Sequence, residues 1–183
     1  MRILFVCTGN VCRSPAAVLL AGALGADEPG LHVESAGTFP LTGQGVHPAT
    51  AAALARRGLD AGGHRARPIG EGLVAAADLV LTMTREQRAE TVAIHPKALR
   101  RTFTLRELRR LVERAEDDSP RGAAAWVASV GRWRGLAEPG PDDVPDPYGR
   151  PEPVHEQVVA LLEQELLVSL PPLLRAVRAV SSR

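Results

Sequence analysis

The stretch ILFVCTGNVCRSP, residues 3–15, constrains the fold more than any other part of the sequence. Its first four residues form an uninterrupted apolar run, which is typical of a strand buried on both faces of a parallel sheet. Gly9 and Asn10 end that run. Ser14 and Pro15 then start a new element, because Ser is a favoured N-cap and Pro a favoured first helical residue. The stretch therefore predicts a strand, a tight loop and the N-terminus of a helix.

The loop between that strand and that helix, from Cys7 to Arg13, is suited to binding an anion. Gly9 and Asn10 tolerate positive φ, so the loop can curl with successive backbone N–H groups pointing inward. The following helix adds free N–H groups and the positive end of its dipole. Arg13 can hold two oxygens of a phosphoryl group with its planar guanidinium. Cys7 lies at the base, where this positive environment favours the nucleophilic thiolate.

These residue types predict covalent catalysis through a cysteinyl-phosphate. The alternative is a buried structural cysteine next to an incidental arginine, because a bare Cys-x5-Arg spacing is a weak signal in a chain rich in arginine. The strand before the loop, the Gly-Asn pair within it and the Ser-Pro pair after it favour the catalytic interpretation.

The nine residues CTGNVCRSP, 7–15, fit the pattern C-x-G-N-x-C-R-S-P at every position. The stretch resembles the signature of the low-molecular-weight protein tyrosine phosphatases. That resemblance implies a cysteine-dependent phosphatase that needs no cofactor. It also implies that the Ser14 hydroxyl donates a hydrogen bond to the sulfur and eases its departure. The residues it assigns to binding the phosphoryl group are Thr8, Gly9, Asn10, Val11, Cys12 and Ser14.

The segment SAGT, residues 35–38, is also similar to this family. The resemblance implies that Ser35 hydrogen-bonds Asn10 and holds it in a strained conformation. The loop that follows, residues 38–48, would then form one wall of the substrate cleft. Family members often carry Trp or Tyr there, whereas the candidates in this chain are Phe39 and Leu41. The substrate preference is therefore open.

A proline-rich loop, residues 138–153, supplies the candidates for the general acid. Protonation of a leaving phenolate needs such an acid, and the residues alone do not distinguish among Asp142, Asp143 and Asp146. The resemblance does, because Asp-Pro-Tyr is the general-acid loop of the family. It implies that Asp146 is the acid and that Tyr148, the only tyrosine of the chain, is an aromatic wall of the cleft.

The order of the predicted elements indicates a single α/β domain over residues 1–183. We expect a four-stranded parallel sheet in the order 2-1-3-4, with helices on both faces and the phosphate-binding loop after the first strand. The expected strands are 3–6, 31–35, 78–82 and 101–105. The expected helices are 14–25, 49–57, 71–77, 85–95, 106–115, 123–134 and 154–178, the last kinked or split by Pro171 and Pro172.

Two further segments carry smaller predictions. An insertion around residues 115–140 contains Trp126 and Trp133, seven residues apart, which we expect to pack on the body of the domain. The sequence GHRAR, residues 63–67, resembles a family segment, and its basic character favours a solvated loop over a second anion site.

Composition limits the partners. The net charge of +1 indicates no strong attraction to nucleic acid or to a membrane surface, and no apolar run reaches transmembrane length. Two cysteines five residues apart do not make a disulfide framework, and we expect a cytoplasmic protein. No pair of histidines has the spacing of metal ligands, so we predict no metal. The oligomeric state is left open.

Three other functions are alternatives to this prediction. A thioredoxin-coupled arsenate reductase shares the fold and the loop, but it needs further cysteines, and none follows Cys12. A protein-arginine phosphatase of the same family resembles CTGNTCRSP. The apolar Val11 of this chain fits an aryl phosphate better than a polar guanidine.

The third alternative is a non-catalytic phosphate-binding or redox-sensing module. The presence of Cys7, Arg13 and Asp146 together argues against it. Cys12 is either a small packed residue or the partner of Cys7 in a reversible disulfide. The expected substrate is a phosphotyrosine protein or an aryl phosphate.

Overall fold

A four-stranded parallel sheet in the order β2-β1-β3-β4 forms the centre of the computed structural model, as predicted. The structure describes residues 1–114, 122–135 and 140–181. The strands are β1 (Arg2–Cys7), β2 (His32–Gly37), β3 (Leu79–Thr82) and β4 (Thr102–Thr104). Because all four run in the same direction, their carboxyl ends meet at one edge, where the loop after β1 begins.

Strand β1 is buried on both faces, which explains its continuous apolar sequence. Ile3 and Phe5 belong to the larger core, which also contains apolar residues of α1, α5 and α7. Leu4 and Val6 belong to the smaller core with α3 on the opposite face. Successive side chains of a strand point to opposite faces, so one apolar run supplies both cores.

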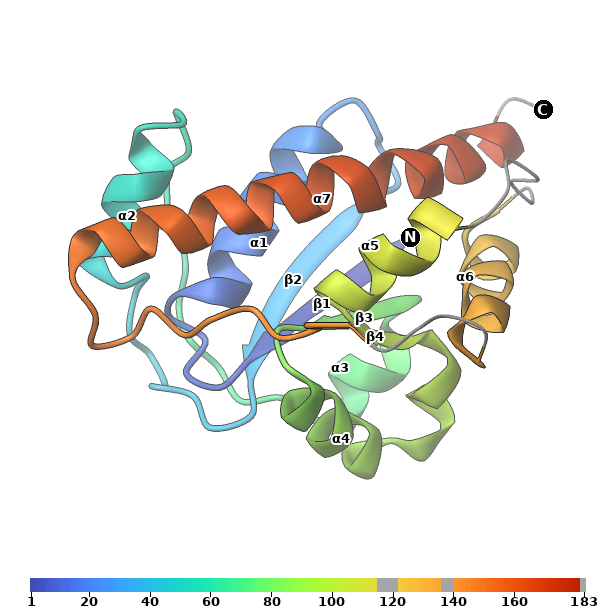
Figure 1. The fold of residues 1–183 in the computed structure, drawn as a ribbon, viewed down its shortest axis with the longest axis horizontal. Coiled ribbons are helices and arrows are strands. Elements are labelled where there is room, and N and C mark those ends of the chain that lie inside the picture. The colour runs from blue at the N-terminus through green and yellow to red at the C-terminus, as the bar shows by residue number, and fades with distance from the viewer. Residues whose placement is uncertain (115–121, 136–139, 182–183) are drawn as a thin grey trace.

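Helices cover both faces of the sheet (Figure 1). The long helix α7 runs across one face and contacts α1, α2, α5 and α6. The opposite face is covered by α3 and η1, with α4 beside them. The helices are α1 (Arg13–Leu24), α2 (Pro48–Ala55), α3 (Glu71–Ala76), α4 (Arg85–Ile94), η1 (Pro96–Arg101), α5 (Leu105–Arg114), α6 (Ala123–Arg132), η2 (Trp133–Gly135) and α7 (Glu152–Ser181).

One detail of the predicted helices is wrong, and for the last helix, expected to be kinked or split, the split is excluded. Helix α1 begins at Arg13 with Cys12 as its N-cap residue, and no side chain caps it, so Ser14 lies inside the first turn instead of capping it. The Ser14 hydroxyl is used elsewhere, as described below. Helix α7 continues through Pro171 and Pro172 and is not split.

The predicted insertion is described only in part, because residues 115–121 and 136–139 lie outside the described residues. The part that is described forms α6 and η2. Trp126 is buried in the larger core and Trp133 packs against that core, so the prediction that both pack on the domain is confirmed.

Helix α7 also bears on the expectation that no segment could span a membrane. By length and composition alone, Glu152–Ala179 qualifies as a candidate, because it contains an apolar window of 18 residues with a mean hydropathy of 1.3. Half of that apolar window is buried in the domain, and a core helix of a soluble protein passes the same test.

Candidate active site

The loop from Cys7 to Arg13 leaves the carboxyl end of β1 and is held from outside through its carbonyl groups. Each carbonyl oxygen of residues 7–12 accepts a hydrogen bond. Within residues 1–114, 122–135 and 140–181, no protein acceptor is found for the N–H groups of residues 8–12. A loop with its carbonyls engaged outside and its N–H groups free is an anion-binding nest. The donors, in the order of the carbonyls, are Thr38, Phe39, Leu41, His64, His47 and Ala16.

Asn10 sets the curl of this loop. Its φ of 53° is the one positive φ at a non-glycine position among the described residues. Its Nδ2 donates to the hydroxyls of Ser14 and Ser35, each at 2.9 Å, and its Oδ1 accepts from the N–H of Arg67 at 3.0 Å. The Asn10 side chain is fully buried, and these three bonds hold the left-handed conformation in place.

Ser14 connects Asn10 to the cysteine at the base of the loop. Its Oγ lies 2.9 Å from the Sγ of Cys7. Because that oxygen already accepts a hydrogen bond from Asn10, the hydroxyl proton is available to the sulfur. Ser14 is therefore placed to stabilise a thiolate at Cys7.

Gly37, at the end of β2, lets this strand approach the loop closely. A Cβ at Gly37 would lie 2.4 Å from the carbonyl oxygen of Thr8 and 3.0 Å from the Cβ of Asn10. At 2.4 Å the Thr8 backbone would have to move, which is costly because its carbonyl group is part of the phosphate loop. The glycine of the SAGT segment is thus required by the packing of β2 against the loop.

Three residues that brace the loop were missed at the sequence level. The expectation of a solvated loop at residues 63–67 is wrong for His64, whose Nε2 donates to the carbonyl of Asn10 at 2.7 Å. Arg67 is exposed, as expected of a solvated loop, but it also bonds Asn10 through its N–H and the Ser35 carbonyl through its Nε. Gln87, in the first turn of α4, donates to the Thr8 hydroxyl at 3.0 Å. The family resemblance of GHRAR was the one available signal.

Arg13 lies at the start of α1 with its guanidinium in the cleft. The side chain is 5% exposed, and its Nη1 donates to the carbonyl of Val144 at 3.2 Å. Its Nη2 lies 2.6 Å from Oδ2 of Asp146. Its Nε is buried and has no hydrogen-bond partner in the described part of the chain. A buried donor without an acceptor is costly, so this atom is suited to donate a hydrogen bond to an anion in the loop.

The structure separates the three candidate acids of the proline-rich loop. Asp142 is buried in ion pairs with Arg85 and Arg110. Asp143 accepts a hydrogen bond from the N–H of Arg85. Asp146 lines the cleft, and its side chain is 53% exposed. Of the three, only Asp146 is placed to reach a bound substrate.

The cleft above the loop has a volume of about 190 Å³. Val11 and Leu41 form an apolar patch near its floor, and the two candidate aromatic walls, Phe39 and Tyr148, also line it. Phe39 is 80% exposed and Tyr148 54% exposed, so both rings are accessible to a ligand. The backbone N–H of Tyr148 donates to Oδ1 of Asp146, which joins this wall to the acid.

Cys12 is one of the residues that line the cleft, and its thiol also lies close to His47, just before α2, and to His155, in the first turn of α7. Both cysteines of the chain are buried and unpaired. Burial raises the pKa of the Cys12 thiol to about 11, an effect that the Thr50 side chain opposes. The Cys12 thiol is therefore protonated at neutral pH.

Comparisons with known proteins agree with this geometry. A family model described as "Low molecular weight phosphotyrosine protein phosphatase" matches residues 2–121. The chain is 37% identical over 145 residues to "Probable low molecular weight protein-tyrosine-phosphatase EpsP" of Ralstonia solanacearum. That match covers 70% of this chain and 94% of the relative.

Two solved structures have the same fold. "YwlE arginine phosphatase from Geobacillus stearothermophilus" matches with a TM-score of 0.71 and 27% identity, covering 100% of this chain and 97% of that one. A low molecular weight protein tyrosine phosphatase from T. tengcongensis matches with a TM-score of 0.69 and 29% identity, covering 91% and 95%. The similarity thus extends over nearly the whole domain.

Proposed function

Because the chain belongs to the low molecular weight phosphotyrosine protein phosphatase family, we propose that it hydrolyses phosphotyrosine through a phosphorylated Cys7. The family membership makes it a cysteine-dependent phosphatase. The proposal assigns the nucleophile to Cys7, the binding of the phosphoryl group to Arg13 and residues 8–12, and the general acid to Asp146.

The observation that carries this proposal is that the phosphate loop and Arg13 hold a set of hydrogen-bond donors without acceptors among the residues that the structure describes. The buried Nε of Arg13 and the N–H groups of residues 8–12 have no acceptor within the described residues. A phosphoryl group in the loop would accept these bonds with its three equatorial oxygens. The charge of the transition state is concentrated on those oxygens, so the same donors stabilise the transition state.

In the first step the thiolate of Cys7 attacks phosphorus and the bond to the phenolic oxygen breaks. The Ser14 hydroxyl, whose Oγ lies 2.9 Å from the Cys7 Sγ, stabilises the thiolate by donating a hydrogen bond. Asp146, at the open side of the cleft, donates its proton to the leaving oxygen, so that a neutral phenol departs. The ion pair of Asp146 with Arg13 must break for this to happen, because the same carboxyl group cannot hold the guanidinium and reach the leaving oxygen.

In the second step water hydrolyses the cysteinyl-phosphate. Asp146, now ionised, accepts a proton from the water, and the sulfur leaves as a thiolate that Ser14 again stabilises. Inorganic phosphate then leaves the loop. No group other than these side chains is needed to balance the protons of the two steps.

The walls of the cleft favour an aromatic substrate. Val11, Leu41, Phe39 and Tyr148 offer apolar surface to a phenol ring above the loop. A second candidate is phosphoarginine, because an arginine phosphatase is among the solved structures with this fold. A guanidine is polar and charged, and the side chain of Val11 offers it no hydrogen bond, so phosphotyrosine is the better fit.

The test is phosphate release from peptides that carry phosphotyrosine, phosphoserine or phosphoarginine, measured in parallel. We expect release from phosphotyrosine that Cys7→Ser abolishes. A preference for phosphoarginine would show that the apolar walls do not determine the substrate. Release that survives Cys7→Ser would overturn the assignment of the nucleophile.

A further inference from the structure

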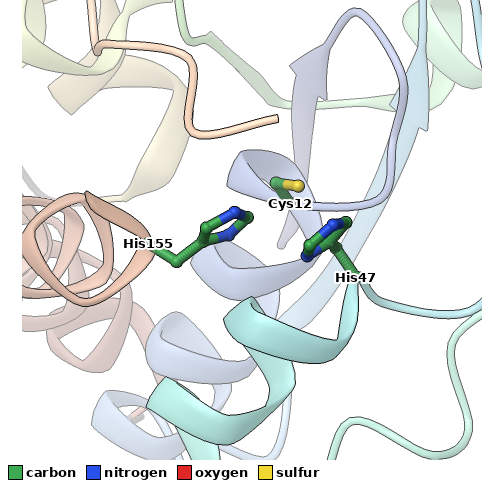
Figure 2. Close-up of side chains that lie close together, drawn as sticks. All are labelled: Cys12, His47 and His155. Carbon is green, nitrogen blue, oxygen red and sulfur yellow. The ribbon is translucent and has the colours of Figure 1, made fainter. Parts of the chain in front are cut away.

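Cys12, His47 and His155 come together behind the phosphate loop, although they lie far apart in the sequence. One ligand atom of each lies within 4.8 Å of the others. Figure 2 shows the sulfur of Cys12 facing the two imidazole rings, which come from the segment before α2 and from the first turn of α7. The expectation of no metal rested on the spacing of histidines along the sequence, and spacing does not reveal a cluster of this kind.

His155 is completely buried, and one of its two nitrogens is unused. Its Nδ1 lies 2.7 Å from the hydroxyl of Thr50. No hydrogen-bond partner reaches its Nε2 in the described part of the chain, although the Arg150 carbonyl is close enough to influence the ring. The Thr50 side chain also lowers the pKa of the nearby Cys12 thiol, against the effect of burial. When its proton points to that sulfur, Nδ1–H of His155 donates to Thr50 and a lone pair is left on Nε2.

This arrangement around His155 is the one that metal-binding histidines have. Such a residue binds the ion through one nitrogen and donates its other N–H to a fixed acceptor, which sets the tautomer and the ring orientation. The hydroxyl of Thr50, a residue that is 1% exposed, lies 2.7 Å from Nδ1 and can serve as that acceptor. The unsatisfied Nε2 is therefore explained if an ion occupies the cluster.

His47 stacks on His155 with 4.5 Å between the ring centroids and 14° between the planes. Its Nδ1 accepts a hydrogen bond of 3.3 Å from the N–H of Ala49. The nitrogen lone pairs of nearly parallel rings do not point toward a common position. The His47 ring must therefore tilt before both rings can bind the same ion. The ring is only partly buried and its cap bond is long, so a tilt breaks little of the structure.

The two elements that carry the histidines are tied together. Arg57, just after α2, forms ion pairs with Glu156 at 2.6 Å and Glu163 at 2.9 Å on α7. Arg56 forms a further pair with Glu156 at 2.7 Å. These contacts fix α2 against α7, so the approach of the two rings does not depend on the metal.

We propose that Cys12, His47 and His155 bind one Zn²⁺ ion. One thiolate and two imidazoles form a nitrogen and sulfur set that suits zinc, whereas magnesium and calcium prefer oxygen. The sulfur loses its proton to solvent when it binds, because the thiolate is the ligand. Three protein ligands leave a fourth tetrahedral position for water.

A zinc ion at this site would act on the phosphate loop through Cys12 and not through the nucleophile Cys7. It would link Cys12 to α2 and α7 through the side chains of His47 and His155. It also occupies the sulfur of Cys12, which can then no longer form a disulfide with Cys7. Zinc would thus keep Cys7 and Cys12 from forming a disulfide under oxidising conditions.

The experiment is zinc binding to the Cys7→Ala protein, measured by competition with a chromophoric chelator. Removing Cys7 excludes the nucleophile as a ligand. We expect one equivalent of zinc to bind, and His155→Phe and His47→Asn each to abolish or greatly weaken that binding. Asn at position 47 retains an N-cap for α2, so this variant is expected to fold even if the first does not.

His32→Gln is the matched control, because this exposed histidine lies outside the cluster. It should bind zinc like its parent. Equal zinc affinity in His47→Asn and in the parent would overturn the proposal, as would equal weakening by His32→Gln. Failure of the parent to bind one equivalent would overturn it as well.

Two further measurements separate a ligand from a structural residue. Co²⁺ in place of zinc should give a thiolate-to-metal charge-transfer band in the Cys7→Ala protein, and Cys12→Ser should remove it. Thr50→Val, which removes the acceptor of the His155 N–H, should weaken zinc binding by about 10-fold to 100-fold. A cobalt band that persists in Cys12→Ser would assign the thiolate elsewhere and sink the proposal.

Discussion

Arg13 Nη2 lies 2.6 Å from Asp146 Oδ2, which joins the phosphate loop to the proline-rich loop. The guanidinium is buried, whereas the carboxylate is half exposed. A phosphoryl group in the loop would compete with Asp146 for Arg13. The proposed function therefore requires substrate binding to release the Asp146 carboxyl group, so that this group is free to reach the leaving oxygen.

Asp146→Asn should therefore slow reactions that need a proton on the leaving oxygen. We expect kcat for a phosphotyrosine peptide to fall by about 10²-fold to 10⁴-fold, the usual contribution of a general acid. 4-Nitrophenyl phosphate has a better leaving group and should lose much less. Asp143→Asn is the matched control, since Asp143 is bonded to the Arg85 backbone and should retain both activities. Equal losses for the two substrates would contradict the assignment of the acid.

Asn10 allows its side-chain bonds to be separated from its backbone strain. Asn10→Gly removes the bonds to Ser14, Ser35 and Arg67 while the φ of 53° costs glycine nothing. We expect it to lower the free energy of unfolding by about 1–3 kcal/mol and to lower kcat. Asn10→Ala should lose roughly 1 kcal/mol more, because alanine disfavours a positive φ. Urea unfolding gives both values, and an Asn10→Gly protein as stable as the parent would refute this role.

Gly37→Ala should disturb the phosphate loop through sterics alone. Its Cβ would meet the Thr8 carbonyl at 2.4 Å, so we expect lower stability and weaker binding of inorganic phosphate as a competitive inhibitor. Gly72→Ala in α3 is the control. Its Cβ meets nothing within 4 Å, and alanine should stabilise that helix by about 0.5–1 kcal/mol. A Gly37→Ala protein with unchanged phosphate inhibition would show that the close approach is dispensable.

His64 should make stability depend on pH. Burial lowers its pKa below the ordinary 6.5, and the nearby Arg65 and Arg67 act in the same direction, against the bond to the Asn10 carbonyl. As pH falls below about 6.5 the unfolded chain takes up a proton that the folded protein resists, so the free energy of unfolding decreases. Well above that pH both states are neutral and the effect vanishes.

His64→Gln retains a donor for the Asn10 carbonyl and removes the titration. The free energy of unfolding of this variant, measured against pH, should fall less steeply below about pH 6.5 than that of the parent. The two curves should run parallel above it. Parallel curves over the whole range would show that His64 titrates normally in the folded protein.

The sheet could be predicted because each strand carries its own signal. The apolar run of β1 and the similar run of β3 need two covered faces, and the helical segments between successive strands are long enough for the chain to cross over and return in parallel. The sequence also predicted the contact between Asn10 and Ser35, which rests on the resemblance of two short segments. What could not be predicted was support that depends on tertiary packing. The bonds of His64 and Gln87 to the loop, and the meeting of Cys12 with His155, join residues whose sequence neighbours give no such signal.

The N-terminus of α1 shows why the prediction of Ser14 as a helix N-cap was wrong. Ser14 followed by Pro15 is a favoured helix start, yet the helix begins one residue earlier and no side chain caps it. The Ser14 hydroxyl bonds Asn10 and Cys7 instead. The N–H groups that a cap would have used are left for an anion, so the departure from the rule lies at the proposed site.

The central claim is that Cys7 carries the phosphoryl group, and the most direct test is to trap that intermediate. The protein would be mixed with a phosphotyrosine peptide, quenched within milliseconds and examined by mass spectrometry. The account predicts one added phosphoryl group on the peptide that contains Cys7, and none in Cys7→Ala. Turnover without any phosphorylated Cys7, or a phosphoryl group on another residue, would contradict it.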